Sequence, residues 1–173
     1  MVPYPSNGIR QAAPEELQVL IVILAFNKAE QLLTVVRQAL AVHRNVLVVD
    51  DGSTADGVGM DIFAELGVEV VRNEQNRGRG AAVLTACRNA RRMRVTHIIT
   101  VDAGGLYDPH DFQVLYEAIC RDVDALIVGR RNRQKTARSR MASFWLRLQT
   151  GVNLIDPRCG FRAYPLAVLE NLT

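Results

Sequence analysis

Strand patterns alternate with helical patterns five times along this chain. The run Val19 to Phe26 is continuously apolar and rich in Val and Ile, as in a strand buried on both faces. Four further strand patterns follow, separated by apolar residues at helical spacing; they cover residues 45–50, 68–72, 97–101 and 125–129. Such alternation predicts an α/β fold with three α/β/α layers and a mostly parallel central sheet.

Residues 18–173 are predicted to form a single domain after a loosely held N-terminal arm, residues 1–17, which has three prolines and no periodicity. A domain of this length buries roughly 70% of its unfolded surface, so it needs no disulfide or metal to fold. Three widely spaced cysteines without a CxxC pair indicate free thiols in a reducing compartment. No apolar run is long enough to span a bilayer and no leader opens the chain, so we expect a cytoplasmic protein.

Two helical features carry specific expectations. Asn27 stands three residues before Glu30, a spacing that predicts a capping box at a helix start. After the fifth strand the alternation stops, and an apolar stripe at helical spacing is expected to pack in the core. The stripe consists of Met141, Phe144, Trp145 and Leu148.

The positive charge is concentrated in two segments without acids. Residues 75–94 contain six arginines, and residues 129–140 contain five arginines and one lysine, although the net charge is only +3. Such segments suit phosphates, lipid headgroups or nucleic acid. No aromatic residue interrupts either segment, which argues against stacking of single-stranded bases, so we expect no nucleic-acid partner.

Polar residues and glycines occupy the ends of four consecutive predicted strands. They are Asn27, the pair Asp50 and Asp51, the loop 76–80, and Asp102. Ligands of open parallel sheets bind at the carboxyl ends of the strands. The turn after the first strand has no GxGxxG motif, and the chain has no GxxxxGK[ST] loop, which excludes dinucleotide-binding Rossmann and P-loop proteins.

These strand ends, in this order and spacing, resemble the family 2 glycosyltransferases with the GT-A fold. Within that family the chain is most similar to enzymes of the dolichyl-phosphate mannose synthase type, which transfer a sugar from a nucleotide sugar to a polyprenyl phosphate. The match runs from about Val19 to Pro165. Its segments are residues 25–27, the DDGS turn at 49–53, the loop 76–80, residues 101–103, residues 108–109, and residues 156–162 with the motif CGFR.

The resemblance implies a site for a UDP- or GDP-linked sugar. Asp51 is expected to accept a hydrogen bond from the nucleobase, since a carboxylate can only accept, and Asp50 to shape the turn. The glycines of the loop allow close approach of the backbone, with Arg79 as a basic group beside them. The residues expected to bind the nucleotide sugar are Ala25, Phe26, Asn27, Asp50, Asp51, Ser53, Asn76, Gly78, Arg79, Gly80, Asp102 and Ala103.

The resemblance also implies a divalent cation, Mg²⁺ or Mn²⁺, on the diphosphate. Asp102 matches the first acid of the DxD motif, but Gly104 and Leu106 stand where the family has oxygen ligands. Lys28 stands where the family commonly has an acid. We therefore expect a weakly held cation, with Asp102 as its metal ligand and as a catalytic residue.

The last matching segment corresponds to the acceptor side of the family's site. Asp156 is the candidate general base for a hydroxyl acceptor, whereas a lipid phosphate is already ionised and needs cations for placement. The expected acceptor-binding residues are Arg130, Arg131, Lys135, Gly160, Phe161 and Arg162.

Together these features predict a C-terminally truncated catalytic domain that moves a sugar to a polyprenyl phosphate. The full-length protein is expected to work at the cytoplasmic face of a membrane, with residues 130–140 facing the lipid surface. Two alternatives stay open: a catalytically degenerate nucleotide-sugar-binding domain, suggested by Gly104 and Leu106, and a basic nucleic-acid-binding module.

Overall fold

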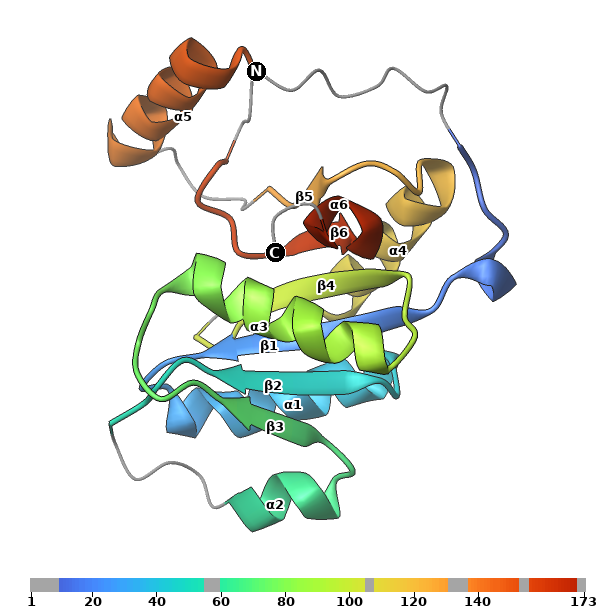
Figure 1. Ribbon diagram of the computed structural model, residues 1–173, viewed down its shortest axis with the longest axis vertical. Helices are drawn as coiled ribbons and strands as arrows, with labels where there is room; N and C mark the ends of the chain where they lie inside the picture. Colours follow the sequence, from blue (N-terminus) through green and yellow to red (C-terminus); the bar gives the residue numbers. More distant parts are fainter. Residues whose placement is uncertain (1–9, 55–59, 105–107, 131–136, 153–155, 171–173) are drawn as a thin grey trace.

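The computed structural model describes residues 10–54, 60–104, 108–130, 137–152 and 156–170. A short 3-10 helix, Pro14–Glu16, precedes the first strand. The strands are β1 (Val19–Ala25), β2 (Val46–Asp50), β3 (Glu69–Arg72), β4 (His97–Asp102), β5 (Ile127–Val128) and β6 (Arg162–Pro165). The helices are α1 (Ala29–Val42), α2 (Met60–Glu65), α3 (Arg79–Arg92), α4 (Pro109–Arg121), α5 (Ala137–Thr150) and α6 (Leu166–Glu170) (Figure 1).

The six strands form one sheet in the order β3-β2-β1-β4-β6-β5. Strands β1 to β4 are parallel, and β6 runs antiparallel to both β4 and β5. The predicted α/β class with a mostly parallel sheet is confirmed. The strand β6 was not predicted, and β5 is shorter than the predicted strand over residues 125–129.

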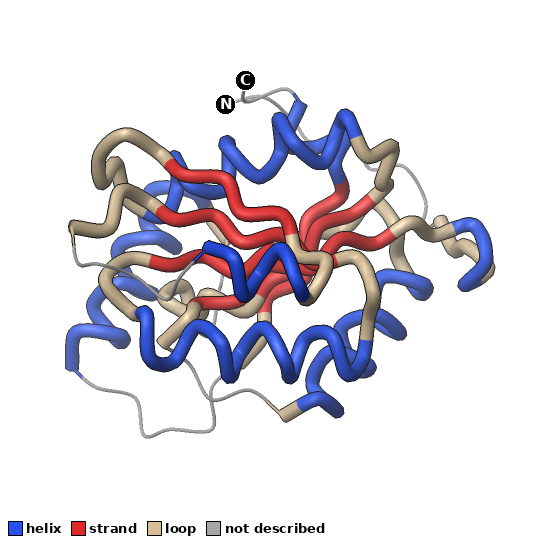
Figure 2. Tube along the Cα trace, turned by 90° about the horizontal axis from the view of Figure 1, so that it is seen from below, coloured by secondary structure: helices blue, strands red, loops and turns tan. Residues whose placement is uncertain are grey.

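Alternate residues of the central strands face two separate cores. Val19, Ile21 and Ile23 pack toward α1 and α4, whereas Leu20, Val22 and Leu24 pack toward α3 and α6. Every residue of β1 is buried, which explains its continuous apolar run. Helices therefore cover both faces of the sheet (Figure 2).

The described part of the N-terminal arm, residues 10–17, is held against the domain. The Ala12 N–H donates to the Cys120 carbonyl, the Val123 N–H donates to the Arg10 carbonyl, and Arg10 pairs with Asp124 at 2.9 Å. The backbone and the charged side chain of these residues therefore have partners around the end of α4. The arm's first residues, 1–9, lie outside the described residues.

The expected capping box at α1 is absent. Lys28 is the N-cap residue and makes no side-chain capping hydrogen bond, because the side chain of Asn27 is used elsewhere, on the turn after β2. The helix itself starts within two residues of the predicted position.

Helix α5 carries the apolar stripe that was expected in the core, and that expectation is wrong. Met141, Phe144, Trp145 and Leu148 are 59%, 62%, 53% and 65% exposed. In Figure 1 this helix stands apart from the sheet and its covering helices. None of the helices in the described part of the chain is long and apolar enough to cross a membrane.

Candidate functional site

A pocket of about 230 Å³ opens at the carboxyl edge of β1, β2 and β4, beside the start of α3. Parallel pairing places Ala25 beside Asp50 and Leu24 beside Asp102, so residues far apart in the sequence meet at one edge. The lining residues are Leu24, Ala25, Phe26, Asp51, Asn76, Gly78, Arg79, Ala82 and Asp102. Of the described residues expected to bind the nucleotide sugar, Asn27, Asp50, Ser53, Gly80 and Ala103 do not line it.

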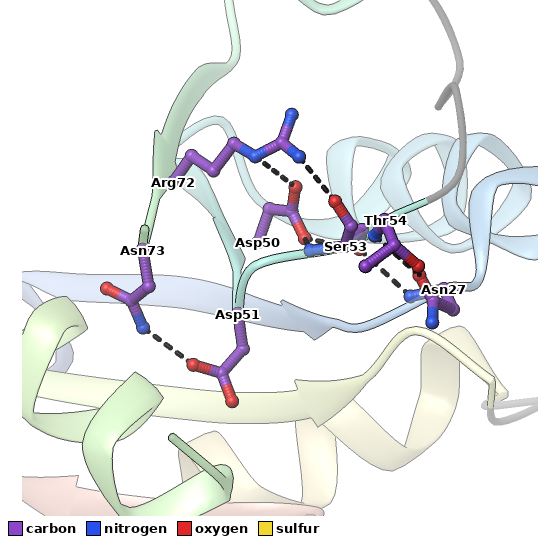
Figure 3. Close-up of polar contacts among 7 residues, drawn as sticks. All are labelled: Asn27, Asp50, Asp51, Ser53, Thr54, Arg72 and Asn73. Carbon is purple, nitrogen blue, oxygen red and sulfur yellow. Dashed lines mark hydrogen bonds and ion pairs between the residues drawn. The ribbon is translucent and has the colours of Figure 1, made fainter. Parts of the chain in front are cut away.

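Asp50 directs its carboxylate into its own turn (Figure 3). The Ser53 N–H and the Ser53 hydroxyl both donate to Asp50 Oδ1, and Arg72 Nε lies 3.4 Å from Oδ2. Arg72 also donates to the Ser53 carbonyl oxygen. The carboxylate therefore organises the turn after β2 and ties it to the end of β3.

Asn27 joins the end of β1 to the same turn (Figure 3). Its backbone N–H donates to Ser53 Oγ at 2.9 Å, and the Thr54 N–H donates to Asn27 Oδ1 at 3.0 Å. Its φ of 51° lies in the left-handed region, which asparagine tolerates better than most residues. This conformation lets Asn27 bridge two strand ends.

Asp51 is 5% exposed and holds the glycine loop in place. Asn73 Nδ2 donates to its Oδ1 at 2.7 Å, and the Gly78 N–H donates to its Oδ2 at 2.8 Å; the Arg77 N–H lies 3.3 Å from both oxygens. Gly52 packs so closely on the backbone of Gln75 and Asn76 that a Cβ would overlap it. The turn and the loop thus form one rigid wall of the pocket.

Asp102 and Arg79 form an ion pair across the pocket, with 2.6 Å between Oδ2 and Nη2. Arg79 Nη1 also donates to the Arg158 carbonyl at 3.3 Å. The backbone of Gly160 lies against the Asp102 carboxylate, where a side chain would collide with it. Arg79 therefore links the glycine loop, the end of β4 and the segment that precedes β6.

The donor set suits a cation held mostly by substrate phosphates. Among the described residues, no group of three His, Cys, Asp or Glu side chains could hold a metal ion. Gly104 supplies no ligand, and the Lys28 side chain lies against it. Asp102 alone fits a divalent cation that receives its other ligands from the diphosphate and water.

On the expected acceptor side, the described side chains mainly support the fold. Arg162 Nε donates to the Cys159 carbonyl at 2.7 Å, and its Nη2 donates to the Pro157 carbonyl. The Phe161 ring is buried, edge-on to Phe112, with 5.1 Å between centroids. The Arg162 guanidinium thus shapes the 157–159 turn, and the Phe161 ring faces the core.

Neither Arg130 nor Asp156 is among the pocket's lining residues. Arg130 is exposed at the end of the sheet, and Asp156 is half-buried at the start of the CGFR segment. Arg131, Lys135 and Leu106 lie outside the described residues.

Sequence reasoning did not single out Asn73 or Arg72 as site residues. Both lie at the end of β3, where Asn73 supports Asp51 and Arg72 supports Asp50. Their position directly at the end of a predicted strand was the signal that could have found them.

Comparison with known proteins identifies relatives of the whole domain. The chain is 30% identical to the undecaprenyl-phosphate 4-deoxy-4-formamido-L-arabinose transferase of Pseudomonas fluorescens, over 98% of this chain and 50% of that protein. It is 30% identical to the polyprenol monophosphomannose synthase of Mycolicibacterium smegmatis, over 90% of this chain and 64% of that protein. The chain therefore spans about half to two thirds of the length of these relatives.

The fold is also that of solved GT-A enzymes. Glucosyl-3-phosphoglycerate synthase from Mycobacterium tuberculosis, in complex with Mn²⁺, UDP-glucose and phosphoglyceric acid, superimposes with a TM-score of 0.75 at 19% identity. The superposition covers 97% of this chain and 64% of that one. The GT-A class expected from the sequence is thereby confirmed.

The family model for glycosyl transferase family 2 matches residues 20–168, which include all of β1 except its first residue, β2 to β4 and every described residue of the pocket. This chain belongs to glycosyl transferase family 2.

Proposed function

We propose that this domain transfers a glycosyl group from a UDP- or GDP-linked sugar to a polyprenyl phosphate. The observation that carries the proposal is the single pocket in which Asp51, Gly78, Arg79 and Asp102 meet. The relatives named for undecaprenyl-phosphate and polyprenol substrates support the acceptor class.

In this proposal Asp51 accepts a hydrogen bond from the nucleobase, and the diphosphate lies along the loop beside Gly78 and Arg79. A phosphate oxygen of the acceptor attacks the anomeric carbon in line. The bond from that carbon to the diphosphate oxygen breaks, and the electron pair leaves with the nucleoside diphosphate. Arg79 stabilises the charge that develops on the leaving group. The acceptor phosphate is already ionised, so Asp156 would act as a base only toward a hydroxyl acceptor.

We propose that a divalent cation, Mg²⁺ or Mn²⁺, binds weakly with Asp102 as its one protein carboxylate. When bound, such an ion neutralises charge on the diphosphate. The Arg79 guanidinium already pairs with Asp102 at 2.6 Å, so the charge of this carboxylate is balanced before any ion arrives.

Calorimetric titration with UDP- and GDP-sugars, with and without MnCl₂, combined with a transfer assay to polyprenyl phosphate, tests the proposal. Asp51→Asn should weaken binding strongly, because one oxygen that accepts from the loop becomes a donor. Glu69→Gln is the matched control, since this exposed acid begins β3 at the far edge of the sheet. Binding without transfer favours the degenerate binding domain, and absence of nucleotide binding overturns the proposal. Tight DNA or RNA binding without nucleotide binding favours the nucleic-acid alternative.

The second part of the proposal is that the full-length protein works at the cytoplasmic face of a membrane. The exposed apolar stripe of α5 supports it, together with exposed Arg147 on the same helix and the basic segment before it. A basic amphipathic helix binds an anionic bilayer by inserting its apolar side chains at the headgroup level. Each basic residue near such a surface adds about 1 kcal/mol.

Flotation with anionic and neutral vesicles, at low and high salt, tests this second part. Charge reversal at Arg130, Arg131 and Arg133, and separately Trp145→Ser, should each reduce anionic-vesicle binding. Charge reversal of Arg88, an exposed arginine in the middle of α3, is the control. Unchanged binding of both variants would contradict a membrane-facing role for this region.

A further inference from the structure

Lys28 and Gly104 meet beside the nucleotide pocket, although neither was expected to bind the nucleotide. The register that pairs Leu24 with Asp102 brings the segments following β1 and β4 together. A Cβ added at Gly104 would lie 3.4 Å from Lys28 Cε and 3.6 Å from Lys28 Cδ. The lysine side chain thus runs along the space that a side chain at position 104 would enter.

Local structure does not account for a lysine at this position. Lys28 is the N-cap of α1, where Ser, Thr, Asp or Asn are favoured, and it makes no capping hydrogen bond. A cation at a helix N-terminus also faces the positive end of the helix dipole, which is unfavourable. Lys28 is exposed, and its side chain makes no hydrogen bond or ion pair with the residues that the structure describes.

The charges around this contact favour an anionic ligand. Asp102, two residues before Gly104, is paired with Arg79. The other acid that lines the pocket, Asp51, accepts hydrogen bonds from the Asn73 side chain and the Gly78 N–H. Both carboxylates of the pocket therefore have protein partners, which leaves the Lys28 ammonium to an anionic ligand at the place where the proposed function puts the diphosphate.

From this arrangement, which rests on the proposed function, we infer that Lys28 is a diphosphate-binding residue. The Lys28 ammonium supplies positive charge directly, as part of the protein. A second carboxylate, at position 104, would bring positive charge to the same place only by binding a metal ion. An ammonium donates to phosphate oxygens without any bound ion. Nucleotide binding by this domain consequently depends little on divalent cations.

Calorimetric titration of the domain with UDP and with GDP, in EDTA and again in MnCl₂, tests the inference. The unmodified protein should bind in EDTA, and Lys28→Ala should weaken that binding about tenfold, the effect of losing one charged hydrogen bond. Lys28→Arg should retain most of the affinity, because it keeps the charge. The control is Arg44→Ala, which removes an exposed cation just before β2 at the opposite edge of the sheet.

A second pair of variants adds a carboxylate at position 104, with and without the Lys28 side chain. Gly104→Asp fits sterically, since the nearest atom to its Cβ would be the flexible Lys28 Cε at 3.4 Å. Alone, this aspartate should pair with Lys28 and weaken binding in EDTA. Combined with Lys28→Ala, it should make binding depend on MnCl₂ far more than in the unmodified protein. Thermal melting verifies that each variant is folded.

The outcomes separate the two proposals. If nucleotide binds only with MnCl₂ and Lys28→Ala binds as the unmodified protein does, the inference is overturned and the proposed function stands. If neither nucleotide binds under either condition, the proposed function itself fails.

Discussion

The turns on the β1–β3 side of the pocket and helix α5 on the other side are held in very different ways. On the first side, Asp50, Asp51 and Asn27 hold two strand ends and the glycine loop together through hydrogen bonds from side chains and backbone. On the other side, β5 has only two residues and the apolar stripe of α5 is exposed. The turns on the β1–β3 side are therefore held by the domain's own hydrogen bonds, whereas no described residue covers the apolar stripe of α5.

The largest effect is expected where the CGFR segment enters the core. Phe161→Ala removes a ring that is 6% exposed and packs edge-on to Phe112. The free energy of unfolding should fall by about 3–5 kcal/mol, measured by urea denaturation. A loss no larger than that of an exposed aromatic would show that this segment is not part of the core.

Gly52→Ala tests the rigidity of the turns on the β1–β3 side of the pocket. Gly52 has a φ of +73°, and an added Cβ would overlap the backbone of Gln75 and Asn76. We expect a loss of about 3 kcal/mol in unfolding free energy, from the left-handed conformation and the overlap together. Gly67→Ala is the matched control, because Gly67 has a φ of +69° with open space around it, and it should lose only about 1 kcal/mol. Equal losses of unfolding free energy for the two variants would mean that the turn at Gly52 is not in close contact with the backbone of Gln75 and Asn76.

Stability should decrease with falling pH because of His97, at the edge of the sheet opposite the pocket. Burial lowers the pKa of His97 below its ordinary value of 6.5, and this outweighs the hydrogen bond with the Val123 carbonyl and the nearby Asp124. The unfolded chain thus binds the proton more readily than the folded one. This contribution is fully present above pH 6.5 and is lost as the pH falls from 6.5 toward the lowered pKa.

Urea denaturation across this pH range should show a slope of up to about 1.4 kcal/mol per pH unit from this group. His97→Gln should remove that slope, even if the variant is less stable at every pH. A slope unchanged by the substitution would assign the pH dependence to another group.

The smallest effect is expected on the exposed side. Phe144→Ala changes a ring that is 62% exposed, in T-shaped contact with Trp145. The free energy of unfolding should change by no more than about 0.5 kcal/mol. A loss approaching that of Phe161→Ala would mean that α5 is packed against the domain in solution, which would contradict the contrast between the two sides.

The sequence by itself determined the layered α/β fold and the edge at which the pocket lies. Buried parallel strands leave continuous apolar runs, and their carboxyl ends must meet, so Asp51, Gly78 and Asp102 could be grouped without coordinates. Both signals come from residues that are close together along the chain. A single sequence is therefore enough to detect them.

Only the tertiary structure decided the rest. The insertion of β6 between β4 and β5, and the turn of Phe161 into the core, depend on pairing of β6 with β4, about 60 residues earlier, and with β5, about 35 residues earlier. The helical spacing of the α5 stripe shows that one face is apolar but not what covers it, so its exposure could not be read from periodicity. The contact between Lys28 and Gly104 likewise exists only because the β1–β4 register brings two loops together.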